Sequence, residues 1–281
     1  MKLIIYGRSD VGKKRDYNED VFLIGNVIEN ASPIYMEIPI HSSFIRNYGL
    51  LLAVADGMGG HNAGEVASDV SLNLLSRRMM ATRKDRLKAE EIVDMLRDSI
   101  MTAHEAILNM SNLSAEHRGM GTTIAGLYFH ADNLYTFHAG DSRVYRFRNK
   151  ALFQITKDHS FVQSLIDMGQ LDRRDSYSHP QKNVITNSLG GGNDRCEPEV
   201  SDKYGYFDND ILLICSDGLS DMVDEKSLEN ILGSDGTIIQ KADELISCAN
   251  ERGGEDNITL VLIEIQNGED KETIWPRIRK D

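Results

Sequence analysis

Three aspartates that flank apolar runs are the residues of this sequence best suited to chemistry. Asp56 ends the apolar run 49–55, and four glycines follow it within eight residues. Asp217 comes shortly after the run 210–215, and Asp256 comes shortly before the run 258–265. A carboxylate at the end of a buried strand is costly unless something pairs with it, and a cation is the usual partner. Together these positions indicate a cation site, although an ordinary Asp-Gly turn would explain any one of them alone.

The types of residue at these positions favour a hard metal ion. Carboxylate oxygens suit Mg²⁺ or Mn²⁺ better than zinc. The three cysteines are widely spaced and form no CxxC pair, so neither a disulfide framework nor a zinc site is indicated. Two such ions about 3.5–4 Å apart can share a water, lower its pKa and hold a phosphoryl group for attack. The residues therefore predict metal-dependent cleavage of phosphate esters.

Two further segments could contribute to such a site. Arg15 precedes the acidic pair Glu19 and Asp20 at the mouth of an apolar run, 21–24, where it could hold an anion beside the cations. Asp141 falls at a tight turn between two expected strands. The alternatives are an exposed turn arginine and an ordinary turn aspartate.

Composition restricts the class of protein. The chain of 281 residues is 41% hydrophobic and has no low-complexity linker, so we expect one domain over 1–266 and a loosely ordered tail over 267–281. A net charge of −13 argues against nucleic-acid binding. No apolar run approaches the ~18 residues that span a bilayer, and the N-terminus lacks a signal-peptide core. We therefore expect a cytoplasmic protein with no membrane partner.

The elements that must position these residues follow from the hydrophobic pattern. Runs 49–55 and 210–215 are typical of buried strands, and 65–112 predicts two helices broken near 82–88. The basic cluster in and before that break, which includes Lys84, is expected on a solvated helix end. Helices are also predicted over 225–232 and 238–251, with a last strand at 258–265.

Strands 122–130, 133–140, 142–148 and 151–155 have the spacing of an antiparallel meander. Helix 160–168 and the polar stretch after it form a candidate mobile segment, the flap region 157–192. Residues 26–48 have mixed character and are expected to form an extra hairpin or a long loop.

Six sequence blocks then carry a family resemblance. The chain resembles the metal-dependent PPM, or protein phosphatase 2C-type, Ser/Thr phosphatases in their compact bacterial form. Only the second and fifth blocks are specific individually, but all six occur in the family's order and cover about residues 5 to 265. The blocks are RDYNED at 15–20, VADGMGGHNAGEVAS at 54–68, GMGTT at 119–123, HAGDSRVYRFRN at 138–149, CSDGLSDMV at 215–223 and GGEDNITLV at 253–261.

The resemblance implies an α+β fold, a four-layer α-β-β-α sandwich of two packed antiparallel sheets flanked by helices, with metals at one edge. By motif, Asp56 would bridge two metals, the Gly57 carbonyl would bind the first, and Asp217 and Asp256 would bind the second. Asp141, with Asp217, would bind a third and weaker metal.

Other positions are matched to the substrate or to outer ligands. Glu19 and Asp20 would act through waters of the metals, and Arg15 would grip the substrate phosphate. His61 would protonate the leaving oxygen as a general acid, with a purely structural histidine as the alternative.

The function implied is hydrolysis of phosphoserine and phosphothreonine in proteins, with Mn²⁺ or Mg²⁺, by a monomer that opposes a bacterial Ser/Thr kinase. A catalytically silent phosphoprotein-binding module and a small-molecule phosphoesterase are the alternatives. Two departures from the family pattern qualify the resemblance. Residues 26–48 look like an insertion, and Asn187 stands where members often carry arginine, which puts the flap region's part in phosphopeptide binding in question.

Overall fold

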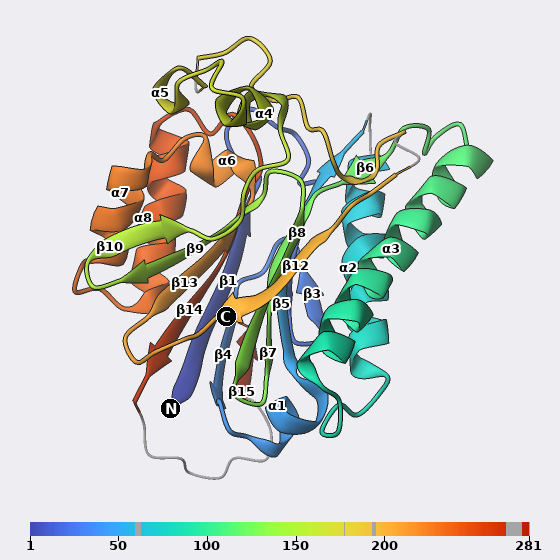
Figure 1. Ribbon diagram of the computed structural model, residues 1–281. Helices are drawn as coiled ribbons and strands as arrows, with labels where there is room; N and C mark the ends of the chain where they lie inside the picture. Colours follow the sequence, from blue (N-terminus) through green and yellow to red (C-terminus); the bar gives the residue numbers. More distant parts are fainter. Residues whose placement is uncertain (60–62, 177, 193–194, 268–276, 281) are drawn as a thin grey trace.

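Two antiparallel sheets pack face to face in the computed structural model, which describes residues 1–59, 63–176, 178–192, 195–267 and 277–280 (Figure 1). Over these residues the first sheet has seven strands in the order β10-β9-β13-β14-β1-β4-β15. Its strands are β1 (Lys2–Asp10), β4 (Ile34–Pro39), β9 (Arg143–Arg148), β10 (Ala151–Gln154), β13 (Ile211–Cys215), β14 (Ile258–Gln266) and β15 (Arg277–Lys280).

The second sheet has eight strands within the same residues, and six of them run in the order β11-β6-β5-β7-β8-β12. Strand β2 pairs with β5 on one side and with β3 on the other. Its strands are β2 (Asp20–Ile24), β3 (Val27–Glu29), β5 (Leu50–Met58), β6 (Gly121–Thr122), β7 (Ile124–His130), β8 (Asn133–Ala139), β11 (Leu189–Gly190) and β12 (Glu199–Tyr204).

Helices cover the outer face of each sheet. Helices α2 (Ala63–Met80) and α3 (Ala89–Leu113) cover the second sheet, while α7 (Glu225–Leu232) and α8 (Ile238–Glu251) cover the first (Figure 1). The short α6 (Asp217–Ser220) directly follows β13, and α4 (Phe161–Asp167) and α5 (Arg173–Ser176) lie above it at one end. Helix α1 (Ser43–Tyr48) closes the other end. The predicted four-layer α-β-β-α sandwich is confirmed.

The alternation of side chains along β5 explains why its run is continuously apolar. Leu52 and Val54 pack between the two sheets, whereas Leu51 and Ala53 pack toward α2 and α3. Because successive residues of a strand point to opposite faces, a strand buried on both sides must be apolar throughout. Asp56 is therefore the first charged residue after a fully buried stretch.

The predicted single meander over 122–155 is wrong. Strand β7 pairs with β8, and β9 pairs with β10, but β8 and β9 belong to different sheets. The chain crosses between the sheets at Gly140, whose φ of 121° is unfavourable for other residues and whose Cβ position would lie 2.6 Å from Thr123. Strand spacing alone does not reveal which neighbour a strand will choose.

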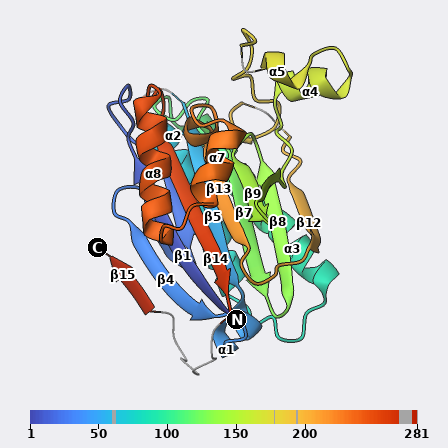
Figure 2. The same cartoon turned by 90° about the vertical axis from the view of Figure 1, so that its left-hand side faces the viewer.

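Residues 26–48 contribute to both sheets instead of forming a hairpin. Strand β3 extends the second sheet, and β4 pairs with β1 in the first. Strand β15 then pairs with β4, so residues 277–280 of the expected loose tail form a strand at the sheet edge (Figure 2). Within the described parts of the chain, no helix combines the length and the apolar character that a membrane span needs.

Lys84 is buried, contrary to its expected place in a solvated basic cluster. Its side chain is 0% exposed, and its Nζ donates to the carbonyls of Met79 and Thr82. The bond to Met79 satisfies a carbonyl in the last turn of α2, which a helix leaves without an intrahelical partner, and the bond to Thr82 holds the segment that follows the helix. Lys84 is therefore a structural cap.

Candidate metal centre

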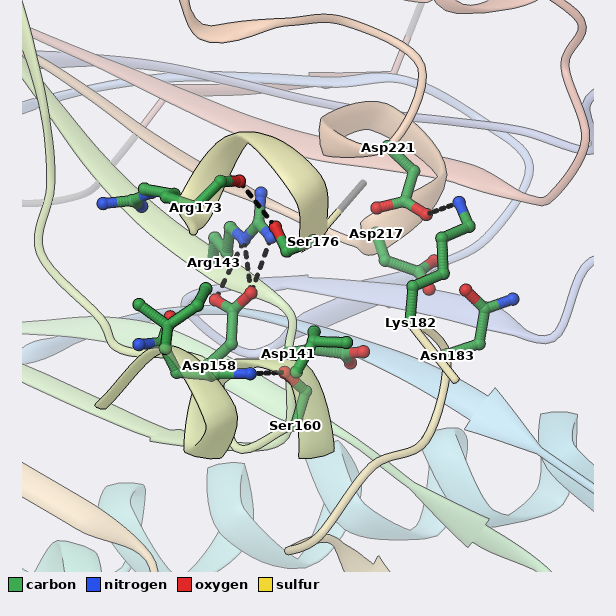
Figure 3. Close-up of a pocket in the computed structure, with 13 residues that line it drawn as sticks. Asp141, Arg143, Asp158, Ser160, Arg173, Ser176, Lys182, Asn183, Asp217 and Asp221 are labelled. Carbon is green, nitrogen blue, oxygen red and sulfur yellow. Dashed lines mark hydrogen bonds and ion pairs between the residues drawn. The ribbon is translucent and has the colours of Figure 1, made fainter. Parts of the chain in front are cut away.

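Five of the aspartates singled out from the sequence gather where the two sheets meet. Asp56 on β5 lies directly opposite Asp20 on β2. Asp217 begins α6 after β13, and Asp256 precedes β14, the strand that pairs with β13. The two groups are joined by the Ser216 hydroxyl, which donates to Asp20 Oδ2 over 2.7 Å. The fifth, Asp141, lies at the turn between β8 and β9 and faces Asp217 across a shared pocket (Figure 3).

Backbone contacts hold Asp56 in place. Its N–H donates to Thr123 Oγ1 at 3.2 Å, and its carbonyl accepts from Thr122 Oγ1 at 2.9 Å. A Cβ at Gly57 would lie 2.3 Å from the Gly64 carbonyl oxygen, so only glycine allows β5 to approach the start of α2 so closely. The threonines of the GMGTT block therefore position Asp56, a role that sequence reasoning did not assign to them.

Burial and, after it, the crowding of carboxylates raise the pKa values of the aspartates at this site. Burial raises the pKa of Asp20 to about 8, and the charges of Asp217 and Asp256 add to the shift. Burial raises the pKa of Asp217 to about 6, with the charges of Asp221 and Asp256 adding to it. The pKa of Asp56 is raised well above its ordinary value by burial and by its acidic neighbours, Asp20 first. A cation among these groups would relieve their mutual repulsion.

The donor set fits a hard divalent cation. Among the described residues, Asp141 Oδ1 and Asp217 Oδ1 are buried carboxylate oxygens without a hydrogen-bond partner. Such groups are costly to bury unless something pairs with them. All the converging ligands are oxygens, which Mg²⁺ and Mn²⁺ prefer. The residues present therefore fit the metals expected from the sequence.

Arg15 lies at the solvent side of this group. Its Nη2 donates to Asp256 Oδ2 at 2.7 Å, and 49% of its side chain is exposed. Burial acts to lower the pKa of Arg15, but Asp256, Glu19 and Asp56 outweigh it, so the net pKa is raised. The guanidinium is thus always charged and accessible beside the carboxylates.

Asn257 fixes the loop that carries Arg15 and Glu19. Its side-chain amide donates to the carbonyls of Val11 and Tyr17, and its Oδ1 accepts from the N–H of Glu19 at 2.8 Å. Asn257 therefore orients the backbone of this loop. His61, the proposed general acid, lies outside the described residues.

The flap region covers a pocket of about 50 Å³ beside Asp141 and Asp217 (Figure 3). Arg143 forms a bidentate pair with Asp158 in its wall, with N–O distances of 2.6–3.0 Å. Burial raises the pKa of Asp141 well above its ordinary value, and the charge of Arg143 only partly offsets this shift and the similar shift of Asp217. Sequence reasoning missed this pair, because no local pattern connects two polar residues 15 positions apart.

The half-buried Asn187 forms hydrogen bonds within the protein itself. Its Oδ1 accepts from the N–H of Glu197 at 3.0 Å, and its Nδ2 donates to the Glu197 carbonyl at 2.8 Å. It also approaches His159 Nδ1, which accepts from the N–H of Gly140 beside Asp141. The asparagine therefore ties the root of the flap region to the turn that carries Asp141.

The metal-free protein is expected to lose stability as the pH rises from about 7 to about 8. Asp20, Asp56 and Asp141 have raised pKa values, so the native state holds protons that the unfolded chain has released. Stability then falls with rising pH, by about 1.4 kcal/mol per pH unit for each extra proton. The buried His130 and His138 have lowered pKa values, so they change the pH dependence of stability only at lower pH.

Urea unfolding in EDTA at the two pH values would measure this slope, and Asp20→Asn should reduce it. Equal stability of the EDTA-treated wild type at both pH values would contradict the prediction.

Known proteins resemble this chain over nearly its whole length. The sequence pattern of the family described as protein phosphatase 2C matches residues 40–262. The serine/threonine phosphatase Stp of Listeria monocytogenes is 38% identical over 258 residues, which are 92% of this chain and 94% of that protein.

Solved structures agree with that similarity. The S. agalactiae serine/threonine phosphatase has a TM-score of 0.80 and 34% identity, with 94% of this chain and 100% of that chain covered. The catalytic domain of the phosphatase PstP, solved with two manganese ions, has a TM-score of 0.73 and 30% identity, with 95% and 100% covered.

Proposed function

The chain belongs to the protein phosphatase 2C family and is a serine/threonine phosphatase, and on this basis we propose that it hydrolyses phosphoserine and phosphothreonine in proteins with two divalent cations, Mn²⁺ or Mg²⁺. The observation that carries the proposal is the convergence of five aspartates, two of them with buried oxygens that have no protein partner. The manganese ions of the PstP structure support the choice of metal. We further propose that its substrates include a bacterial Ser/Thr kinase; a monomeric state and a cytoplasmic location stay predictions.

The proposed ligands divide between the two ions. Asp56 would be shared by both, the Gly57 carbonyl would bind the first, and Asp217 and Asp256 would bind the second. Asp141 would join Asp217 at a third, weaker site, which its unpartnered Oδ1 supports. Glu19 and Asp20 would hold waters of the ions, and the bond from Ser216 to Asp20 supports an outer position for that carboxylate.

Two bound cations would lower the pKa of a shared water and neutralise charge on the phosphoryl oxygens. The chain's own residues supply the rest of the site. Arg15 is exposed enough to meet a phosphate, and its planar fork suits two phosphoryl oxygens. The hydrogen bonds of Asn257 to Val11 and Tyr17 hold the loop that carries Arg15 at the edge of the sheets where the aspartates lie. His61 would supply a proton to the leaving serine or threonine oxygen.

Hydrolysis of a phosphothreonine peptide and of an aryl phosphate, measured in EDTA, Mg²⁺ or Mn²⁺, tests the proposal. Peptide turnover that EDTA removes and Mn²⁺ restores is the expected result. Turnover of the aryl ester without the peptide would instead indicate a small-molecule substrate. No turnover despite Mn²⁺ binding would contradict the catalytic proposal.

Replacing Arg15 with alanine is expected to raise KM for phosphate monoesters about tenfold or more, with a smaller effect on kcat. The reason is the loss of a charge-assisted hydrogen bond to the phosphate, of the kind worth about 1.5–3 kcal/mol. Lys14→Ala removes a neighbouring exposed cation and serves as the control. An unchanged KM for Arg15→Ala would show that this arginine is only a turn residue.

A further inference from the structure

One ion pair connects the flap region to α6. Lys182 Nζ lies 2.7 Å from Asp221 Oδ2, and the two side chains are 37% and 25% exposed (Figure 3). Arg173 reaches Glu225 less closely, at 3.5 Å, and both of those side chains are more than half exposed. Lys182–Asp221 is thus the closer and more buried of these two contacts.

The two ends of the flap region, residues 159–161 and 184–186, form its root and are joined by backbone hydrogen bonds, which hold the root more firmly than the outer part between them. At the root, the N–H of Phe161 donates to the Val184 carbonyl and that of Thr186 donates to the His159 carbonyl, each at 2.8 Å. The outer part includes α5, which has no buried residue. A segment with a fixed root and little apolar burial depends on side-chain contacts to stay closed.

Asp221 also lies next to the candidate metal centre. It caps α6, and its N–H donates to the carbonyl of Asp217 at 2.7 Å. Asp221 and Asp217 also line the same pocket (Figure 3). Lys182 pairs with the Asp221 carboxylate and so offsets its charge.

We propose that Lys182 and Asp221 form a latch that couples the position of the flap region to the charge beside Asp217. With the flap region closed, Lys182 neutralises Asp221. When it opens, Asp221 is left as an extra negative charge near Asp217, which strengthens cation binding there. Because coupling between two equilibria is reciprocal, a cation bound at Asp217 in turn favours the open flap region. The effect on cation binding at Asp217 rests on the proposed function. The role of the Lys182–Asp221 pair in keeping the flap region closed does not.

Two substitutions separate the release of the flap region from the change of charge near Asp217. Lys182→Gln and Asp221→Asn both break the latch, so both should speed amide hydrogen exchange in the flap region, measured in EDTA, by roughly 2- to 5-fold. Their effects on charge are opposite. Lys182→Gln should tighten Mn²⁺ binding in calorimetric titration, and Asp221→Asn should weaken it, each by about 3- to 10-fold.

A matched control is available in the same segment. Lys157→Gln breaks the pair with Asp167, a 2.6 Å contact made by residues that do not line the pocket, and should leave Mn²⁺ affinity unchanged. Unchanged exchange in both latch variants, or a shift of Mn²⁺ affinity in the same direction in both, would overturn the proposal. If the wild type bound no Mn²⁺, the proposed function and the coupling would fail, while exchange in EDTA would still decide whether the latch exists.

Discussion

Replacing Asp217 with asparagine is expected to lower metal-dependent kcat by about a hundredfold or more, the range seen when a group that stabilises developing charge is lost. Asn keeps the shape of the side chain but removes the negative charge that we assign to the second and third ions. Asp217 Oδ1 is buried and has no hydrogen-bond partner, so the protein itself offers no substitute for a cation at that atom. Steady-state turnover of a phosphothreonine peptide over a range of Mn²⁺ concentrations would measure the loss.

The same variant should fold at least as stably as the wild type when both are stripped of metal. Burial and neighbouring charges disfavour the ionised form of Asp217, raising its pKa to about 6, so near pH 8 the neutral amide removes an unfavourable charge. Asp94→Asn, on the exposed face of α3, is the control for a general effect of losing a carboxylate. Turnover by Asp217→Asn at the wild-type rate would remove Asp217 from the metal assignment.

Replacing Asp158 with alanine is expected to lower the free energy of unfolding by about 3–5 kcal/mol, the cost of leaving one partner of a buried pair alone. The side chains of Arg143 and Asp158 are only 15% and 10% exposed, and three hydrogen bonds join them. Without Asp158, the Arg143 guanidinium would keep its charge in a buried site. Urea unfolding should show a lower midpoint with an unchanged slope.

Two further variants test that explanation. Replacing both partners with apolar residues, Arg143→Met with Asp158→Leu, should recover much of the stability, because no buried charge is left without its partner. Lys157→Gln changes the neighbouring residue at an exposed ion pair and should cost less than about 1 kcal/mol. A loss of similar size for Asp158→Ala and Lys157→Gln would contradict the role of burial.

Several strands and helices and the main acidic residues could be predicted because their signals are local, whereas the four-layer fold was implied by the family resemblance. Asp56 and Asp217 each follow an apolar run long enough for a buried strand, and Asp256 precedes another. The helices predicted over 225–232 and 238–251 have the bounds that the structure gives them. Hydrophobic periodicity determines such elements residue by residue, so no knowledge of distant partners is needed.

Contacts between distant segments could not be predicted in this way. Ser216 bonds to Asp20 across 196 positions, and Lys182 meets Asp221 across 39, with no pattern that connects either pair. Strands 133–140 and 142–148 have the spacing of neighbours in one sheet. The chain nevertheless crosses at Gly140, so strand 142–148 belongs to the opposite sheet. Each of these outcomes depends on which surfaces pack together.

The sequence by itself therefore determined the chemistry that this protein can perform: oxygen ligands for hard cations, an arginine beside them, and the ordered motifs of a phosphatase family. Only the tertiary structure decided how that chemistry is arranged. It placed Arg15 against Asp256, left oxygens of Asp141 and Asp217 buried without partners, and set the flap region on α6 through Lys182. The physical reason is that residue type and periodicity are local properties, whereas burial, electrostatic repulsion and pairing arise only when segments far apart in the chain are packed together.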